Sequence, residues 1–137
     1  MQMFSKVNEV PAQPAPATQY CGRVLVVEDS STCALTLKAQ LERLGLNAEW
    51  VETDTRAFTA VFRQPYDLIL MAVGLPVMDG LDGSRLMRSQ GIRTPIVAVT
   101  GQYQTGDSDL CYVHGMDDFL CKPVKFKTLE QAISRWI

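Results

Sequence analysis

Residues 67–80, which read DLILMAVGLPVMDG, carry the strongest structural signal in the chain. Residues 68–71 form a short unbroken apolar run, which is typical of a strand buried on both faces of a parallel sheet. A glycine, a proline and an Asp-Gly pair follow, and this cluster of turn-forming residues ends the strand. Ligands of open parallel sheets bind beyond the carboxyl ends of the strands. At that place stand Ala72 and Val73, whose side chains carry no polar atom.

The pattern of a short apolar strand followed by a helical segment recurs along the chain. Apolar runs predict five strands, at residues 23–27, 47–52, 67–71, 95–99 and 118–121. A helix is predicted after each strand, and the weakest lies at 102–114, where Gly106 and the polar residues after it disfavour a regular helix. This alternation predicts an α/β fold, with helices on both faces of a parallel sheet.

Several local signals add expectations about the helices. Thr128 and Gln131 form a possible capping box at the start of the last helix. Phe62 and Leu86 are expected to face inward, because they fall on apolar stripes of the second and third helices. Gly83 lies inside the third helix, predicted over 81–90, where a glycine costs up to about 1 kcal/mol relative to alanine.

The overall composition is that of one globular domain. The chain has 137 residues, of which 47% are hydrophobic, and this length suits one compact domain with a full core. The net charge of −2 gives no reason to expect direct contact with nucleic acid or an anionic membrane. Four cysteines without a CxxC pair or metal-ligand spacing indicate reduced thiols. We therefore expect a cytoplasmic protein.

Residues 1–22 differ in composition from the rest of the chain. They contain three prolines interleaved with alanine, glutamine and threonine, and such a segment is semi-extended with little to bury. We interpret 1–22 as a flexible linker or tail and 23–137 as the folded domain. A linker would make this chain a piece of a larger protein, and a native N-terminal tail is the alternative.

Polar side chains stand at the carboxyl ends of three other predicted strands. Glu28 and Asp29 follow the first strand, Thr100 follows the fourth, and Lys122 follows the fifth. Buried like charges are unfavourable unless a cation or several donors compensate them. An acidic pair, a hydroxyl and an ammonium in one crevice suit a divalent cation and a phosphoryl group.

Four sequence fragments resemble the receiver domain of two-component response regulators, including receivers attached to hybrid sensor kinases. The fragments are VLVVEDS (24–30), DLILM…PVMDG (67–80), VAVTG (97–101) and GMDDFLCKPV (115–124). They occur in this order across residues 23–137. The resemblance implies a flavodoxin-like, doubly wound sheet of five parallel strands in the order 2-1-3-4-5, with five helices on both faces.

The resemblance also implies a magnesium site. Asp29 would coordinate Mg²⁺, and Glu28 would act largely through water. The backbone carbonyl of Gly74 falls where the family supplies a third protein ligand.

Other matched positions imply roles in phosphoryl transfer and switching. Thr100 is the hydroxyl that bonds the phosphoryl group, and Lys122 pairs with the phosphoryl oxygens and the acidic cluster. Phe119 is the aromatic residue that moves together with Thr100. The Lys122-Pro123 bond is expected to be cis.

One matched position departs from the family pattern. The phosphoacceptor aspartate is expected directly after Met71, and Ala72 stands there. Alanine has no nucleophilic oxygen, so the aspartyl phosphate cannot form at this position, and one metal-ligand carboxylate is lost. The family catalyses its own phosphorylation and dephosphorylation, and this chain is expected to be inactive in both. We interpret Ala72 as an engineered Asp-to-Ala replacement, since the other functional positions keep the expected residue types.

The main alternative is a natural pseudo-receiver that acts as a phosphorylation-independent protein-interaction module. Substitute acceptors at Asp79, Asp82 or the acidic pair are disfavoured, as is phosphotransfer by His114. A nucleotide-binding domain would show a glycine-rich motif after the first strand, and none is present. An aspartate-dependent phosphatase would not need the remaining fragments.

The resemblance implies a histidine kinase or a histidine phosphotransfer domain as the partner. Phosphorylation would shift Thr100 and Phe119 and change a protein-binding face. We expect a monomer, located in the cytoplasm or forming the cytoplasmic part of a membrane-bound kinase.

Overall fold

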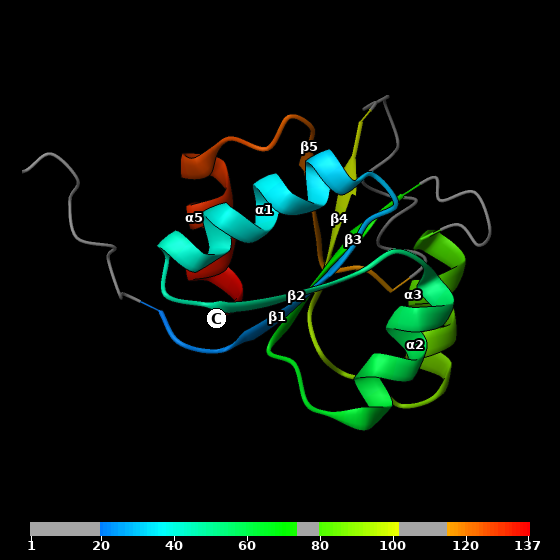
Figure 1. The fold of residues 1–137 in the computed structure, drawn as a ribbon. Helices are drawn as coiled ribbons and strands as arrows, with labels where there is room; N and C mark the ends of the chain where they lie inside the picture. The colour runs from blue at the N-terminus through cyan, green and yellow to red at the C-terminus, as the bar shows by residue number, and fades with distance from the viewer. Residues whose placement is uncertain (1–19, 74–79, 102–114) are drawn as a thin grey trace, which may run out of the picture.

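The computed structural model describes residues 20–73, 80–101 and 115–137. The elements in chain order are β1 (Arg23–Val27), α1 (Ser31–Arg43), β2 (Asn47–Val51), α2 (Asp54–Arg63), β3 (Leu68–Ala72), α3 (Gly80–Ser89), β4 (Ile96–Thr100), β5 (Asp118–Cys121) and α5 (Phe126–Trp136). Figure 1 shows the sheet between two pairs of helices. The predicted linker stays a prediction, because residues 1–19 lie outside the described residues.

The five strands form one parallel sheet in the order β2-β1-β3-β4-β5, which confirms the predicted strand order. The register pairs Val27 of β1 with Met71 of β3. It also pairs Thr100 of β4 with Cys121 of β5. Because all five strands run in the same direction, their carboxyl ends lie along one edge of the sheet, where the predicted site residues follow them.

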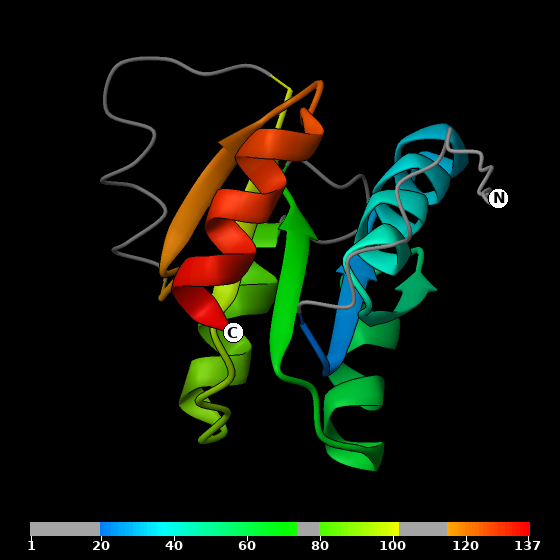
Figure 2. The same cartoon turned by 90° about the vertical axis from the view of Figure 1, so that its left-hand side faces the viewer.

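Two apolar cores lie on opposite faces of the sheet. One core joins α1 and α5 to the sheet through residues such as Leu41, Leu70 and Ile133. The other joins α2 and α3 through residues such as Ala57, Ile69 and Met87. Figures 1 and 2 show the same division into helix pairs. Every residue of β3 is buried, as a strand covered on both faces requires.

The described residues contain four helices, one fewer than the five predicted. The fifth predicted helix, at 102–114, lies outside the described residues. No helix in the described ranges is both long and apolar enough to cross a membrane.

Side chains cap the starts of two helices, and the start of a third differs from the prediction. Ser30 caps α1 by accepting a hydrogen bond from the N–H of Cys33, and Thr53 caps α2 in the same way. The predicted capping box at Thr128 is wrong, because α5 already begins at Phe126. The guanidinium of Arg43 lies 4.2 Å from the Phe126 ring centroid, a contact between helices that the local pattern does not contain.

Two apolar residues predicted to face inward are exposed. Phe62 is 54% exposed and Leu86 is 39% exposed. Phe62 packs edge-on against the ring of Phe58, with the ring centroids 4.9 Å apart. The buried positions of α2 are Asp54 and Ala57, so the inner face of this helix includes a carboxylate that the apolar stripe did not predict.

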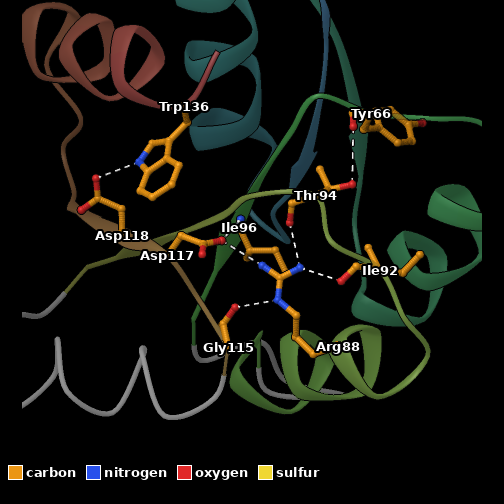
Figure 3. A network of polar contacts seen from close by, with 9 residues as sticks. All are labelled: Tyr66, Arg88, Ile92, Thr94, Ile96, Gly115, Asp117, Asp118 and Trp136. Carbon is orange, nitrogen blue, oxygen red and sulfur yellow. Dashed lines mark hydrogen bonds and ion pairs between the residues drawn. The ribbon is translucent and has the colours of Figure 1, made fainter.

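Arg88 ties the end of α3 to the strands at the amino edge of the sheet (Figure 3). Its guanidinium donates hydrogen bonds of 2.8–2.9 Å to three backbone carbonyls, those of Ile92, Thr94 and Gly115. It also pairs with Asp117 at 2.8 Å. One arginine thus satisfies carbonyl groups from two loops that are distant in sequence.

A second polar network links the start of β1 to β2 and the end of α2. The carboxylate of Glu49 accepts hydrogen bonds from Arg23 at 2.9 Å, Gln64 at 2.8 Å and Tyr66 at 2.7 Å. Burial, followed by the hydrogen bond to Glu49, raises the pKa of Tyr66 above its ordinary value of 10.0. The negative charge of Glu49 is therefore compensated within the fold.

Gly83 is required by a close approach between α2 and α3. A Cβ atom at this position would lie 2.7 Å from Oδ2 of Asp54, and Asp54 is only 2% exposed. The glycine inside α3 therefore makes room for a buried carboxylate of α2.

The first prediction concerns Gly83. Alanine would raise helix propensity by up to about 1 kcal/mol, but the clash with Asp54 should reverse the sign and destabilise the protein by about 1–3 kcal/mol. Urea unfolding measures the change. In an Asp54→Ala background the carboxylate is gone, so Gly83→Ala should there be neutral or stabilising. An equal loss of stability in both backgrounds would contradict the close approach.

The second prediction concerns Tyr66. Because the pKa of Tyr66 is raised in the folded state, the unfolded state releases this proton first as the pH rises past about 10. The free energy of unfolding should therefore fall above that pH, and it should fall less steeply in Tyr66→Phe. Urea unfolding at a series of pH values from about 8 to 11 tests this. Parallel curves for the two proteins would refute it.

Candidate functional site

The predicted site residues lie around the carboxyl ends of β1, β3, β4 and β5. Glu28 directly follows β1, Ala72 ends β3, Thr100 ends β4, and Lys122 directly follows β5. Ala72 pairs with Val99 of β4 and Met71 pairs with Val27 of β1, so the end of β3 lies between the ends of β1 and β4. The sheet thus brings together residues that are up to 94 positions apart in sequence, since Lys122 forms an ion pair with Glu28.

The ion pair between Glu28 and Lys122 is the central contact of this edge. Lys122 Nζ lies 2.6 Å from Glu28 Oε1, and the Glu28 side chain is 1% exposed whereas that of Lys122 is 25% exposed. The contact is an ion pair rather than a well-directed hydrogen bond. Oε2 accepts a hydrogen bond of 3.0 Å from the N–H of Ser30. A buried carboxylate requires such compensation, because a lone charge at this depth would be strongly unfavourable.

The backbone of Glu28 is fixed by two contacts with β2. Its N–H donates to the carbonyl of Val51 at 3.0 Å. Its carbonyl accepts a hydrogen bond of 2.7 Å from Nε1 of Trp50. The sequence reasoning missed this role of Trp50, because it depends on the register between β1 and β2 and leaves no local signal.

Asp29 differs from Glu28 in its surroundings, since it is exposed. Ala72 is 3% exposed, and its methyl group belongs to the apolar core beneath α2 and α3. Ala72, at the carboxyl end of β3, is therefore apolar, whereas the residues at the carboxyl ends of the neighbouring strands are polar.

Only part of a magnesium site is present among the described residues. Mg²⁺ prefers oxygen ligands in octahedral geometry. Both oxygens of Glu28 already have partners, Asp29 is available, and position 72 supplies no oxygen. The described ranges contain no cluster of three or more acidic, histidine or cysteine side chains suited to a metal. Gly74 lies outside the described residues, so this donor set fits Mg²⁺ only weakly.

The remaining predicted residues flank the ion pair. The backbone N–H of Lys122 donates to the carbonyl of Thr100 at 2.7 Å, which joins the ends of β4 and β5. The Lys122-Pro123 bond is cis, as the resemblance implied. Phe119 is partly buried against the core beneath α2 and α3. Asp79 and His114 lie outside the described residues, and the side chain of Asp82 is likewise not described.

A cavity of about 350 Å³ opens beside the ion pair, between α1 and the turn after β5. Its lining is mainly apolar and includes Leu37, Val99 and Val124, with Cys33 and Lys122 among the polar side chains. A partner that approaches Lys122 from this side would meet an apolar surface.

Comparisons with known proteins identify the family of the chain. A model of the family described as response regulator receiver domain matches residues 24–134. Two-component system protein A of Emericella nidulans is 35% identical over 118 residues, which cover 82% of this chain and 17% of that protein. Two-component response regulator ORR41 of Oryza sativa subsp. japonica is 35% identical over 83% of this chain and 93% of its own length. The chain spans only about a sixth of the length of the histidine kinases and related proteins that head the matches.

A solved structure agrees over most of the chain. The receiver domain of sensor histidine kinase PA1611 from Pseudomonas aeruginosa PAO1, which has a magnesium ion coordinated in its active site cleft, is 36% identical with a TM-score of 0.78. The match covers 85% of this chain and 98% of that one. Given these matches and the sheet topology, the chain belongs to the response regulator receiver domain family of two-component systems.

Proposed function

We propose that this chain is the receiver module of a phosphorelay, in a form that cannot accept a phosphoryl group at position 72. The observation that carries the proposal is the ion pair of the buried Glu28 with Lys122 beside Ala72, at the carboxyl edge of the sheet. A cation and a carboxylate held there suit phosphoryl transfer, in which positioning and charge neutralisation supply most of the catalysis. The Asp-to-Ala interpretation of position 72 is part of this proposal.

The partner would be a histidine kinase or a histidine phosphotransfer domain. Similar proteins include histidine kinases and a two-component response regulator that matches over 93% of its own length, which supports a phosphohistidine donor. In a chain with aspartate at position 72, a carboxylate oxygen would attack the phosphorus and form a new O–P bond. The N–P bond to the donor histidine would break, and the imidazole nitrogen would keep the electron pair. Bound Mg²⁺ would supply charge neutralisation for the transferred group.

Residues of this chain would support the transfer as follows. The ammonium of Lys122 would turn from Glu28 toward a phosphoryl oxygen, while the hydroxyl of Thr100 would donate to another. Movement of Thr100 and Phe119 would then change the surface around β4 and β5, which is a switch driven by a local change in charge. With Ala72 in place, Lys122 stays paired with Glu28 and the chain rests in its inactive state.

The pseudo-receiver is supported by the apolar surroundings of position 72. Ala72 is buried within an apolar core, and the neighbouring Glu28 and Lys122 compensate each other's charge. The edge of the sheet is therefore internally compensated without an acceptor. In this second proposal the chain signals by protein binding alone.

The third prediction is a phosphotransfer experiment. The chain should take up no phosphoryl group from a small-molecule donor such as acetyl phosphate or from a phosphohistidine protein. Ala72→Asp should gain one, and intact-mass analysis would detect it. Ala72→Asn is the matched control, because asparagine has a shape similar to that of aspartate but no charge, and this variant should stay unmodified. A stable phosphoryl adduct on the chain with Ala72 would refute the proposal, as would an inert Ala72→Asp that is folded.

The fourth prediction concerns magnesium and stability. Two carboxylates about 4 Å apart repel by about 4 kcal/mol at an effective dielectric constant near 20. Because Lys122 offsets much of this, Ala72→Asp should lose a net stability of about 1 kcal/mol in chelator. The same variant should bind Mg²⁺ more tightly, and the metal should restore the lost stability. Calorimetry and urea unfolding measure both effects. Equal stability in chelator together with unchanged Mg²⁺ affinity would show that the edge is not built as proposed.

A further inference from the structure

A groove lies between the edge strand β2 and helix α2, away from the ion pair. It encloses about 430 Å³, and its lining includes Glu49, Trp50, Arg56, Thr59 and Arg63. Figure 2 shows β2 as the teal arrow at the right-hand edge of the sheet, above the green turns of α2. We call this surface the β2–α2 groove.

The outer edge of β2 offers unpaired backbone groups to this groove. In the described sheet β2 pairs with β1 alone. The N–H of Asn47 and the carbonyl of Val51 point to the chain of β1. Because backbone groups of successive residues point to opposite sides of a strand, those of Ala48 and Trp50 point outward. No other strand in the described ranges bonds them, so an extended segment could add here.

The charge of the groove is positive. Arg56 and Arg63 lie seven residues apart on α2, about 10 Å along its axis and on the same side. Both are exposed, and no ion pair with either is formed among the described residues. The carboxylate of Glu49 is already compensated by Arg23 and Tyr66. Residues 55–66 contain no aspartate or glutamate.

The unpaired edge of β2 and the two arginines favour one kind of ligand for the β2–α2 groove. We propose that the β2–α2 groove binds an extended acidic segment of a protein partner, which adds to the edge of β2 and places its carboxylates against Arg56 and Arg63. A second copy of this chain fits poorly, since a pair of equivalent edges would bring the arginines of both copies together. In an added strand alternate side chains face α2, so acids at every second position suit the groove. The proposal does not depend on phosphoryl transfer.

The test uses the full chain and a synthetic probe. The probe is a fluorescein-labelled, end-capped nine-residue peptide of alternating glutamate and valine, and its binding is followed by fluorescence anisotropy. Arg56→Gln/Arg63→Gln should bind it at least about tenfold more weakly, a change of about 1.4 kcal/mol. The matched control, Arg85→Gln/Lys127→Gln, removes two exposed charges elsewhere and should change the affinity less than about twofold. A peptide with lysine in place of glutamate should not bind.

Amide hydrogen exchange separates strand addition from simple charge attraction. Saturating acidic peptide should slow exchange of the N–H groups of Ala48 and Trp50, because both would enter the new ladder. Three results would overturn the proposal. They are no binding of the acidic peptide at millimolar concentration, equal binding by the two variants, and unchanged exchange at both amides. Self-association of the free chain that protects the same two amides would also overturn it, in favour of a second copy.

Discussion

The ion pair between the buried carboxylate of Glu28 and the partly exposed Lys122 sets the constraint on which this edge of the fold depends. A carboxylate that is 1% exposed requires a partner, and the nearest cation comes from the opposite end of the sequence. The pair therefore holds the turn after β1 against the turn after β5. In the sheet, β3 and β4 lie between β1 and β5, so the pairing of these four strands must be correct before the charges can meet. The charge pairing and the strand order support each other.

Ala72 lies within this constraint without taking part in it. Its methyl group packs in the apolar core, while the charges beside it neutralise each other. A carboxylate at this position would add a negative charge beside a pair that is already balanced, and together with the exposed Asp29 it would leave two negative charges that one divalent cation could neutralise. Under the proposed function, the same edge would be a metal-dependent acceptor with aspartate at position 72, and with alanine it would be a surface without an acceptor.

Local apolar runs predicted the strands well, because buried strands appear as such runs, whereas the order of the strands followed only from the family resemblance. The sequence-based predictions were wrong or incomplete where contacts between segments distant in sequence determine the structure. The start of α5 is at Phe126, where Arg43 of another helix lies over the ring, and not at the local Thr128 signal. From the sequence alone, Gly83 is only a residue that lowers the stability of α3. The need for glycine there comes from a carboxylate on α2, which leaves no room for a side chain. The candidate site could be predicted from the residues at the ends of the strands. The contact of Trp50 with Glu28 could not, because it depends on the register between β1 and β2.

That contact also gives the acidic turn an optical reporter. The chain has two tryptophans, and one of them donates its indole N–H to the carbonyl of Glu28 at 2.7 Å. The other, Trp136, donates to Asp118 near the far end of α5. Indole fluorescence depends on hydrogen bonding and on nearby charge, so the fluorescence of Trp50 should change when the acidic turn moves. Movement at this edge of the sheet can then be timed in the unlabelled protein.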